Sequence, residues 1–275
     1  MTTHELKEVL VQATDVSLKF DEKVILKPTT VEVRDIVRPD TCQGQVIGIL
    51  GPSGVGKTVF SRILAGLQEP THGSVVVNIG GKMVPVQPGF VGMVAQDYPL
   101  FPHRTVLGNL LLALEHTKLS TKDREAKAKE YLDTFELLDK VNKYPSQLSG
   151  GQRQRVSIIR ELLSSEHYIV MDEPFTGLDP IMKDAVCDLI DKVAKLAEHN
   201  TLFVVAHDLP ALTQIADQLW LFGRDRNEAG GVIPGATIKK TYNLIERGLA
   251  WKPDIASTKQ FGEFVAEVRE QFKGL

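Results

Sequence analysis

The sequence predicts an α/β fold organised around one strand, one glycine-rich loop and one helix. Residues 45–50 are an apolar run of strand length. Residues 51–58 follow the pattern G-x-x-x-x-G-K-T of a phosphate-binding loop. Residues 59–66 then place apolar side chains at the spacing of one helix face and end on a glycine. Because the loop lies between a strand and a helix, the motif has the context that nucleotide binding requires.

The chemistry of this loop explains why it is expected to bind phosphate. Its members are Gly51, Pro52, Ser53, Gly54, Val55, Gly56, Lys57 and Thr58. Glycines lack a Cβ atom, so backbone N–H groups can turn inward and, with the positive end of the following helix, bind the α- and β-phosphates. Lys57 is expected to reach the β- and γ-phosphates, and the Thr58 hydroxyl is expected to bind Mg²⁺.

The composition narrows the classes of function. The chain has 275 residues, of which 43% are hydrophobic and 24% charged, and its net charge is −3. This ordinary globular composition gives no basic footprint for nucleic acid. Cys42 and Cys187 stand in no metal-binding or disulfide pattern. No apolar run approaches the roughly 20 residues that span a bilayer, so we expect the chain not to enter a membrane alone.

The N-terminal part of the chain predicts antiparallel β-structure. Residues 9–20 and 24–33 are the predicted strands of one hairpin, and residues 74–79 and 82–86 those of a second. Phe20 ends the first strand, upstream of the phosphate-binding loop. From the spacing alone, its ring either stacks on an adenine base or fills a small hairpin core.

The middle of the chain predicts an inserted helical lobe over residues 97–147. The lobe follows an apolar strand at residues 90–95, which ends before Gln96. A proline-broken apolar loop opens the lobe, and Thr105 is the expected cap of its first helix. Residues 120–138 are predicted to form a second, highly charged helix with one apolar face.

The helix after the lobe begins with a possible second anion site. Ser149 and Gln152 have the spacing of a capping box, and Gly150 and Gly151 leave backbone N–H groups uncovered between them. The plainer alternative is a well-capped helix that binds nothing.

Polar residues follow two further buried strands. Asp172 and Glu173 come directly after the strand at residues 168–171, and His207 follows the strand at residues 201–206. Adjacent carboxylates at the end of a buried strand are costly unless they meet a cation, and ligands bind at this end of an α/β sheet. We therefore expect Asp172 to bind Mg²⁺ and Glu173 to act as the base for water. The alternative is that both residues simply lie in a surface turn after the strand. The position of His207 at the same edge favours a functional role over a structural one.

The C-terminal extension, residues 224–275, predicts one amphipathic helix at residues 257–272. Ser257 and Gln260 have the spacing of a capping box at its start. We expect the apolar face of this helix to dock on its own domain, and a partner or dimer surface is the alternative. Residues 223–235 are polar and glycine-rich and are predicted to form a mobile loop.

Taken in order, these motifs resemble those of the ATP-binding cassette (ABC) ATPases from about Phe20 to about Phe222. Residues 148–152, Leu-Ser-Gly-Gly-Gln, look like the signature sequence of that family. The other matches are Gln96 to the Q-loop, Asp172 and Glu173 to the acidic strand motif, Asp179 to the D-loop, His207 to the switch histidine and Phe20 to the adenine-stacking aromatic. The resemblance implies a P-loop NTPase core with a RecA-like, mostly parallel sheet, an antiparallel β subdomain and an inserted α-helical subdomain. All of these would form a single nucleotide-binding domain over residues 1–275.

The resemblance also implies a head-to-tail dimer that holds two ATP molecules. Each ATP would lie between residues 51–58 of one copy and residues 149–152 of the other. The implied roles are polarisation of water by Glu173, positioning of the γ-phosphate by His207 and Lys57, Mg²⁺ binding by Thr58, Gln96 and Asp172, and communication between the sites by Asp179. The chain departs from the family pattern at Val59, Glu161 and Gly177. Val59 still offers a backbone donor, and no departure removes a catalytic group, so an active ATPase is expected.

The function that the resemblance implies is the ATP-hydrolysing motor of an ABC transporter. Residues 98–110 look like those of bacterial importers of small polar solutes, which use separate membrane-spanning permease subunits. The motor would lie peripherally on the cytoplasmic face of the membrane, and a solute-binding protein would be a further partner. The alternatives are a lipid-trafficking or exporter ATPase, or a soluble ABC ATPase such as one in cluster assembly.

Overall fold

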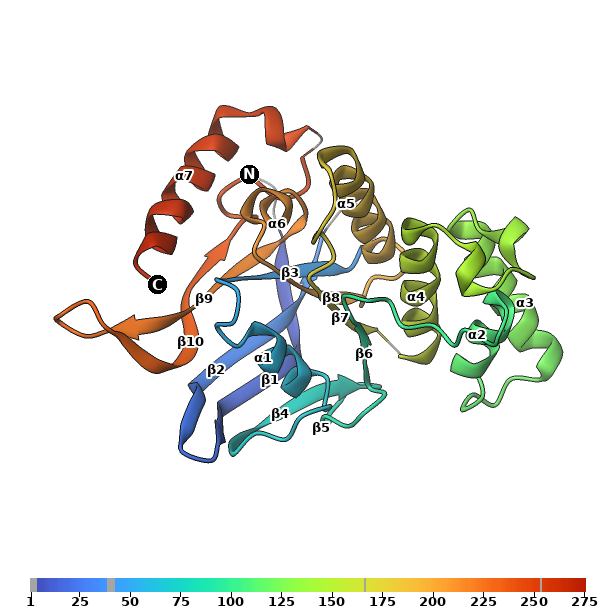
Figure 1. The fold of residues 1–275 in the computed structure, drawn as a ribbon, viewed down its shortest axis with the longest axis horizontal. Helices are drawn as coiled ribbons and strands as arrows, with labels where there is room; N and C mark the ends of the chain where they lie inside the picture. Colours follow the sequence, from blue (N-terminus) through green and yellow to red (C-terminus); the bar gives the residue numbers. More distant parts are fainter. Residues whose placement is uncertain (1–3, 39–42, 166, 253) are drawn as a thin grey trace.

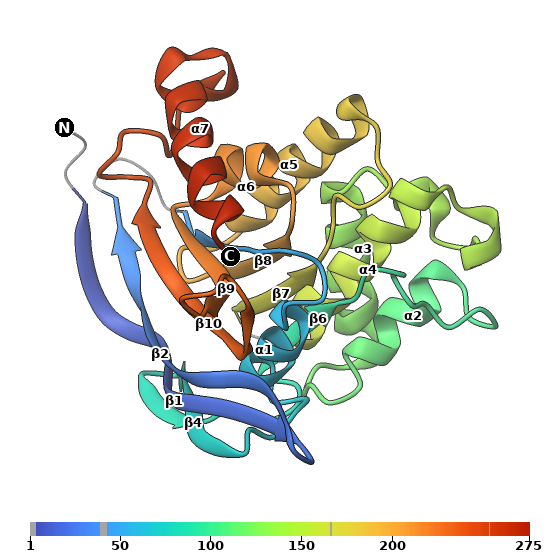
Figure 2. The same ribbon diagram turned by 60° about the vertical axis from the view of Figure 1, so that its left-hand side comes forward.

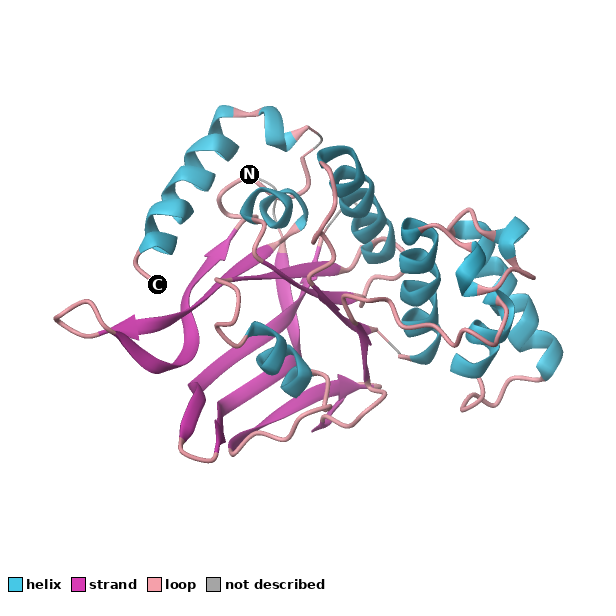
Figure 3. Cartoon of the chain, in the orientation of Figure 1, coloured by secondary structure: helices cyan, strands magenta, loops and turns pink. Residues whose placement is uncertain are grey.

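The computed structural model describes residues 4–38, 43–165, 167–252 and 254–275. Cys42 therefore lies outside the described residues. Within them, ten strands form one sheet in the order β5-β4-β1-β2-β10-β9-β3-β8-β7-β6. Helices gather around this sheet (Figure 3). The mixed α/β fold with a curved, partly parallel sheet confirms the predicted fold class.

One half of the sheet is parallel and buried. Its strands are β3 (Gln45–Leu50), β6 (Val91–Val94), β7 (Tyr168–Asp172), β8 (Thr201–Ala206) and β9 (Gln218–Arg226). Every residue of β3, β7 and β8 is buried, as expected for strands covered by helices on both faces. β3 and β8 pair in parallel register along their full lengths, so their carboxyl ends meet at one edge.

The other half of the sheet is antiparallel except for the parallel contact between its second and last strands, residues 23–37 and 232–243. Its strands are β1 (Glu5–Phe20), β2 (Lys23–Val37), β4 (His72–Ile79), β5 (Lys82–Pro85) and β10 (Val232–Asn243). β1 pairs with both β2 and β4, which confirms the two predicted hairpins and joins them side by side. Seen from the side, β1 and β2 lie at the edge of the molecule opposite α2 and α3 (Figure 2).

Seven α-helices and three short 3₁₀ helices complete the described structure. The α-helices are α1 (Lys57–Leu64), α2 (Val106–Ala113), α3 (Thr121–Thr134), α4 (Gly150–Ser164), α5 (Pro180–Ala194), α6 (Leu209–Ile215) and α7 (Lys259–Lys273). The 3₁₀ helices are η1 (Leu138–Lys140), η2 (Pro145–Gln147) and η3 (Ile255–Ser257). Thr105, Ser120 and Ser149 cap α2, α3 and α4 through their side-chain oxygens. None of the described helices is long and apolar enough to cross a membrane.

The sheet separates two apolar cores. In β3, Ile47 and Ile49 face the core that contains Phe60 of α1. Val46 and Leu50 face the core that contains α4, α5 and α6, because alternate side chains of a strand point to opposite faces. Figure 1 accordingly shows α1 on one side of β3, with α5 and α6 on the other and α2 and α3 at the far end of the molecule.

Two predicted boundaries are wrong at the ends of helices. α3 ends at Thr134 rather than at residue 138, because Glu136 adopts a left-handed φ of 58° that ends the helix. Leu137 is consequently buried, while Leu138, the last residue of the predicted helix, is exposed. In the C-terminal extension, α7 is capped by Thr258, whose hydroxyl accepts a hydrogen bond from the backbone of Phe261, and not by Ser257.

The predicted mobile loop at residues 223–235 is largely a hairpin. β9 continues to Arg226 and β10 begins at Val232, so the connection spans only residues 227–231. Asn227 closes this connection with a backbone hydrogen bond to Gly231 of 2.8 Å and a side-chain bond of 2.7 Å from the Gly231 N–H. The segment is polar because it lies at the surface, and its backbone is paired even though its side chains are not buried.

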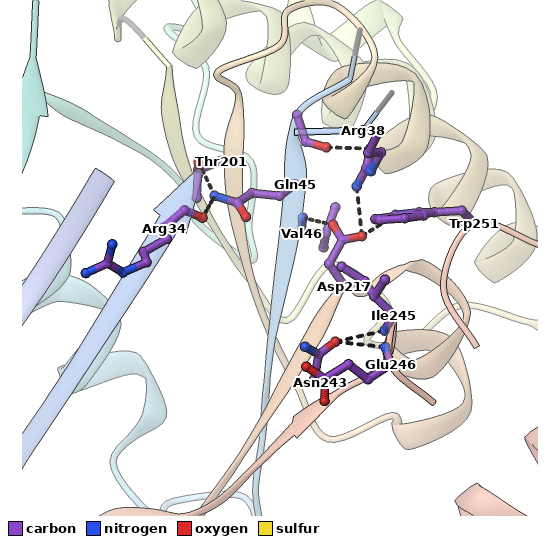
Figure 4. A network of polar contacts seen from close by, with 11 residues as sticks. Arg34, Arg38, Gln45, Val46, Thr201, Asp217, Asn243, Ile245, Glu246 and Trp251 are labelled. Atoms are coloured by element: carbon purple, nitrogen blue, oxygen red, sulfur yellow. Dashed lines mark hydrogen bonds and ion pairs between the residues drawn. The ribbon is translucent and has the colours of Figure 1, made fainter. Parts of the chain in front are cut away.

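The C-terminal extension is held to the core by a buried polar network (Figure 4). Asp217 accepts hydrogen bonds from the Val46 backbone N–H at 2.7 Å, from Arg38 Nη2 at 2.8 Å and from the Trp251 indole N–H. The Arg38 guanidinium also lies 3.9 Å from the centre of the Trp251 ring. Trp251 thereby ties the extension to the start of β3, and α7 packs on α6 beyond it.

Candidate nucleotide-binding site

The phosphate-binding loop runs from the end of β3 to the first residue of α1. Gly51 permits a close approach, because a Cβ atom there would lie 2.5 Å from the Phe222 carbonyl oxygen. Gly56 precedes α1 with a φ of 120°, a conformation that requires glycine. Among the residues that the structure describes, no side chain caps α1, so its first N–H groups are free to bind an anion.

Lys57 occupies the interior of the loop. Its side chain is 5% exposed, and its Nζ donates to the carbonyl oxygens of Gly51 at 2.8 Å and Pro52 at 3.1 Å. The same Nζ lies 3.4 Å from Glu173 Oε1. Burial lowers the pKa of Lys57, and the Glu173 carboxylate opposes this shift. Phosphate oxygens entering the loop would replace the two carbonyl groups as partners of a cation that is already in place.

Thr58 and Asp172 bring two oxygen groups together. Thr58 is the second residue of α1, Asp172 ends β7, and the Thr58 hydroxyl donates to Asp172 Oδ1 at 3.2 Å. Burial raises the pKa of Asp172, and the hydrogen bond from Thr58 lowers it. A hydroxyl and a carboxylate are hard oxygen donors, and Mg²⁺ takes its remaining ligands from phosphates and water. The pair therefore fits a magnesium ion, although no cluster of three or more His, Cys, Asp or Glu side chains occurs in the described ranges.

Glu173 is oriented by groups from three elements. Its backbone has a φ of 52° in the turn after β7, and its N–H donates to the Val205 carbonyl of β8 at 2.7 Å. His207 Nδ1 lies 2.8 Å from Glu173 Oε2, and Thr176 Oγ1 donates to that oxygen at 3.2 Å. The ends of β3, β7 and β8 thus bring Lys57, Glu173 and His207 together, as the sequence predicts. Thr176 was not among the predicted site residues, and its signal in the sequence is a hydroxyl three residues after Glu173 in a turn.

Among the described residues, Gln96, Phe20 and Asp179 form no hydrogen bond or ion pair with this centre. Gln96 is exposed in the turn after β6, and no hydrogen bond joins it to Thr58 or Asp172 in the described structure. Phe20 ends β1 with 49% of its surface exposed, a position open to either predicted role. Asp179 caps α5 by accepting a hydrogen bond from the Met182 N–H at 2.9 Å.

Residues 149–152 form the predicted capping box at the start of α4. Ser149 Oγ accepts a hydrogen bond from the Gln152 N–H at 3.3 Å, and Gln152 Oε1 accepts one from the Ser149 N–H at 2.9 Å. Ser149 and Gly150 are exposed. α4 lies beside the helical lobe, away from α1 (Figure 1). Within the part of the chain that the structure describes, no hydrogen bond or ion pair joins these residues to the phosphate-binding loop.

Comparison with known proteins gives one consistent family. Residues 37–176 match the family described as "ABC transporter". The chain is 40% identical over 182 residues to the "Probable ABC transporter ATP-binding protein PEB1C" of Campylobacter jejuni, covering 64% of this chain and 75% of the relative. It is 31% identical over 262 residues to the methionine import ATP-binding protein MetN 2 of Lactiplantibacillus plantarum, covering 92% of this chain and 70% of the relative.

A solved structure supports the same fold. CbiO1 from Clostridium perfringens, described as part of the ABC transporter complex CbiONQ, superposes with a TM-score of 0.73 over 98% of both chains at 19% identity. At this identity the likeness shows the fold alone, whereas the sequence matches show the family. The chain therefore belongs to the ATP-binding proteins of ABC transporters, which are ATPases.

Proposed function

We propose that this ATPase drives the import of a small polar solute through separate membrane-spanning permease subunits. The methionine import relative supports this direction and this class of solute. Residues 98–103 and the helical lobe would receive a cytoplasmic helix of the permease, so the chain would lie peripherally on the cytoplasmic face of the membrane. A solute-binding protein would deliver the solute from the other side.

The convergence of Lys57, Glu173 and His207 is the observation that carries the proposed mechanism. Glu173 would accept a proton from the attacking water, because His207 and Thr176 fix one of its carboxylate oxygens. His207 would also contact the γ-phosphate, and Lys57 would neutralise charge on the β- and γ-phosphates. Phosphoryl transfer depends chiefly on such positioning and charge neutralisation.

The remaining predicted residues are assigned by the same proposal. Thr58 and Asp172 would hold Mg²⁺, with Gln96 joining when the turn after β6 approaches. A bound Mg²⁺ ion neutralises charge on the phosphate oxygens. Phe20 would stack on the adenine ring, which its exposure at the end of β1 allows.

The proposed assembly is a head-to-tail dimer of two copies. The N–H groups and the Ser149 hydroxyl at the start of α4 are exposed and lie apart from the phosphate-binding loop of their own chain. They would therefore complete the ATP site of the partner copy, and Asp179 would connect the two sites. The dimer test uses Glu173→Gln, which should bind ATP without hydrolysing it. We expect this variant to elute as a dimer with ATP and Mg²⁺ and as a monomer without nucleotide, and a monomer under both conditions would refute the proposed assembly.

Transport is tested by recovering the permease. An affinity-tagged chain expressed in its own cells should co-purify with a membrane-spanning protein from detergent-solubilised membranes. Reconstitution of that complex in liposomes should then give solute uptake that depends on ATP. Recovery of the chain from the soluble fraction alone, with no membrane-spanning partner, would favour a non-transport ATPase instead.

A further inference from the structure

We propose that Tyr98 and Gln154 are positioning residues for ATP hydrolysis, which act by holding the turn that carries Glu173. Tyr98 lies in the loop between β6 and α2, and Gln154 lies in the first turns of α4. Both side chains donate to the carbonyl oxygen of Pro174, the residue after Glu173. This inference rests on the proposed role of Glu173 as the base.

The two hydrogen bonds join three separate elements at one buried atom. Tyr98 Oη and Gln154 Nε2 each lie 3.4 Å from the Pro174 oxygen. Gln154 is 3% exposed, and Pro174 is buried. A buried carbonyl needs a partner, so these donors have a structural reason to converge there.

Backbone strain indicates which residues the two hydrogen bonds to the Pro174 carbonyl must hold in place. Tyr98 has a φ of 48° and Glu173 a φ of 52°, and left-handed values are uncommon for residues other than glycine. Such conformations persist only where the surroundings fix them, and they cluster at functional sites. The Pro174 carbonyl lies between the two strained residues, since Tyr98 bonds to it and Glu173 precedes it. Losing the Tyr98 hydroxyl would therefore loosen the turn that aims the Glu173 carboxylate.

The protonation state of Tyr98 supports a permanent donor. Burial raises the pKa of the Tyr98 hydroxyl to about 12, although a hydrogen bond with Gln154 lowers it in part. The hydroxyl consequently keeps its proton throughout the neutral range. The loss caused by Tyr98→Phe should therefore be the same at every pH at which the protein works.

A second set of contacts fixes α4 to the same loop. Arg160 Nη1 donates to the Pro99 carbonyl at 2.5 Å, and Arg160 Nη2 pairs with Glu161 Oε1 at 2.8 Å. Glu161 Oε2 accepts a hydrogen bond from the Met93 N–H at 3.3 Å, on the edge strand β6. Because α4 bonds to the Pro99 carbonyl and shares the Pro174 oxygen with Tyr98, a displacement of α4 or of the loop would reach Glu173 through Pro174. Contiguous contacts of this kind are a physical route for coupling.

The test compares variants that remove one donor each. Tyr98→Phe and Gln154→Met should each lower kcat for ATP by about three- to tenfold, the loss expected for one hydrogen bond. KM for ATP and the affinity for a fluorescent ATP analogue should stay within about twofold, because neither residue contacts the proposed phosphate site. The double variant should lose more than the product of the two single losses, because one remaining donor still satisfies the Pro174 carbonyl and only the double variant leaves it without a partner. Tyr131→Phe is the matched control, because Tyr131 is also half-buried but lies in α3, and its kcat should not change.

The outcomes separate this inference from the proposed base. An unchanged kcat in Tyr98→Phe would overturn the proposed positioning role. A loss in the double variant equal to the product of the two single losses would also overturn it. A fall in kcat accompanied by a lower Tm and a weaker affinity for the nucleotide would also overturn it, because that pattern indicates a general loosening of the fold. Glu173→Gln is measured alongside. If this variant is inactive while Tyr98→Phe hydrolyses ATP normally, only the positioning role of Tyr98 is refuted. If Glu173→Gln hydrolyses ATP at the parent rate, the proposed role of Glu173 as the base is refuted.

Discussion

Asp217 and Glu173 are both carboxylates close to the ends of the central strands, yet their surroundings differ in one respect. The partners of Asp217 within the described residues are fixed protein groups, and the side chains of Asp217 and Arg38 are 3% and 4% exposed. Glu173 shares Lys57 with two loop carbonyls and contacts a His207 side chain that is 51% exposed. The Asp217 carboxylate is enclosed by the protein, and this centre holds the fold together. The Glu173 centre has a half-exposed histidine that a ligand can reach, beside a lysine whose side chain is 5% exposed.

The pKa shifts follow the same division. Burial raises the pKa of Asp217, and its closest cation, Arg38, opposes this shift within a fully enclosed pair. Burial likewise lowers the pKa of Lys57, with Glu173 opposing. In the first centre both charges are compensated by the protein alone. In the second, phosphate groups would supply additional negative charge beside Lys57, so we expect mutations there to affect turnover more than folding.

The strongest test of this comparison replaces Glu173 with glutamine. Glu173→Gln should lower kcat by roughly 10²- to 10⁴-fold, the usual contribution of a general base, while Tm stays within a few degrees of the parent value. Steady-state ATP hydrolysis and thermal unfolding of the same preparation measure the two quantities. Asp217→Asn is the matched carboxyl-to-amide control and should give the opposite pattern, with a lower Tm and with kcat retained below the unfolding range. Equal loss of Tm in both variants would remove the distinction between the centres.

The next largest effect is expected at Arg38. Arg38→Met should lower the free energy of unfolding by about 3–5 kcal/mol, because it leaves the buried Asp217 carboxylate without its cation. Urea unfolding followed by circular dichroism measures this loss. Arg34→Met is the control, since the Arg34–Glu32 pair is 46% and 36% exposed and should contribute at most about 1 kcal/mol. Losses of similar size in the two variants would contradict a special role for the buried pair.

Trp251 sharpens the comparison at the C-terminal extension. Trp251→Phe removes the indole N–H that bonds to Asp217 but keeps an aromatic ring over Arg38. A hydrogen bond to a charged group contributes about 1.5–3 kcal/mol, and this is the expected loss in the free energy of unfolding. Trp251→Leu removes the ring as well and should lose about 0.5–2 kcal/mol more. Hydrogen exchange at α7 should rise in both variants, and unchanged exchange there would mean that Trp251 does not anchor the extension.

The sequence predicts the buried parallel strands more accurately than the surface hairpin. The limits of β3 and β8 agree with prediction to the residue, because each is a short apolar run between polar residues. The segment around Arg226 was expected to be a loop because its residues are polar, and it forms strand through pairing with β10. Backbone pairing of this kind depends on chain neighbours that local composition does not reveal.

The candidate site likewise contains residues that local sequence patterns predict and contacts that they do not. Lys57 is predictable from the phosphate-binding motif, and Asp172 and His207 from their positions at recognisable strand ends; the structure brings all three to one edge of the sheet. The contacts of Tyr98 and Gln154 with Pro174 join segments 76 and 20 residues apart, and no local pattern indicates them. The catalytic and ligand roles of all these residues remain predictions until the variants are measured.

The smallest effect is expected at an exposed carboxylate that completes the comparison. Asp225 pairs with Lys27 at 2.5 Å and with Lys239, and these two hydrogen bonds lower the pKa of Asp225 to about 2. Because the folded-state pKa lies below the unfolded value of about 3.9, the ionised carboxylate stabilises the fold above about pH 4. That contribution is lost as the pH falls toward 2.

Asp225→Asn should therefore lower the free energy of unfolding at pH 7 by less than about 1 kcal/mol, because the pair is partly exposed and screened by solvent. The difference between the parent and the variant should shrink as the pH falls from 4 to 2, and also when salt is added at pH 7. Urea unfolding across that pH range measures it. A loss as large as that of Arg38→Met would show that exposure does not separate the two ion pairs, and the contrast between enclosed and open centres would then need another physical basis.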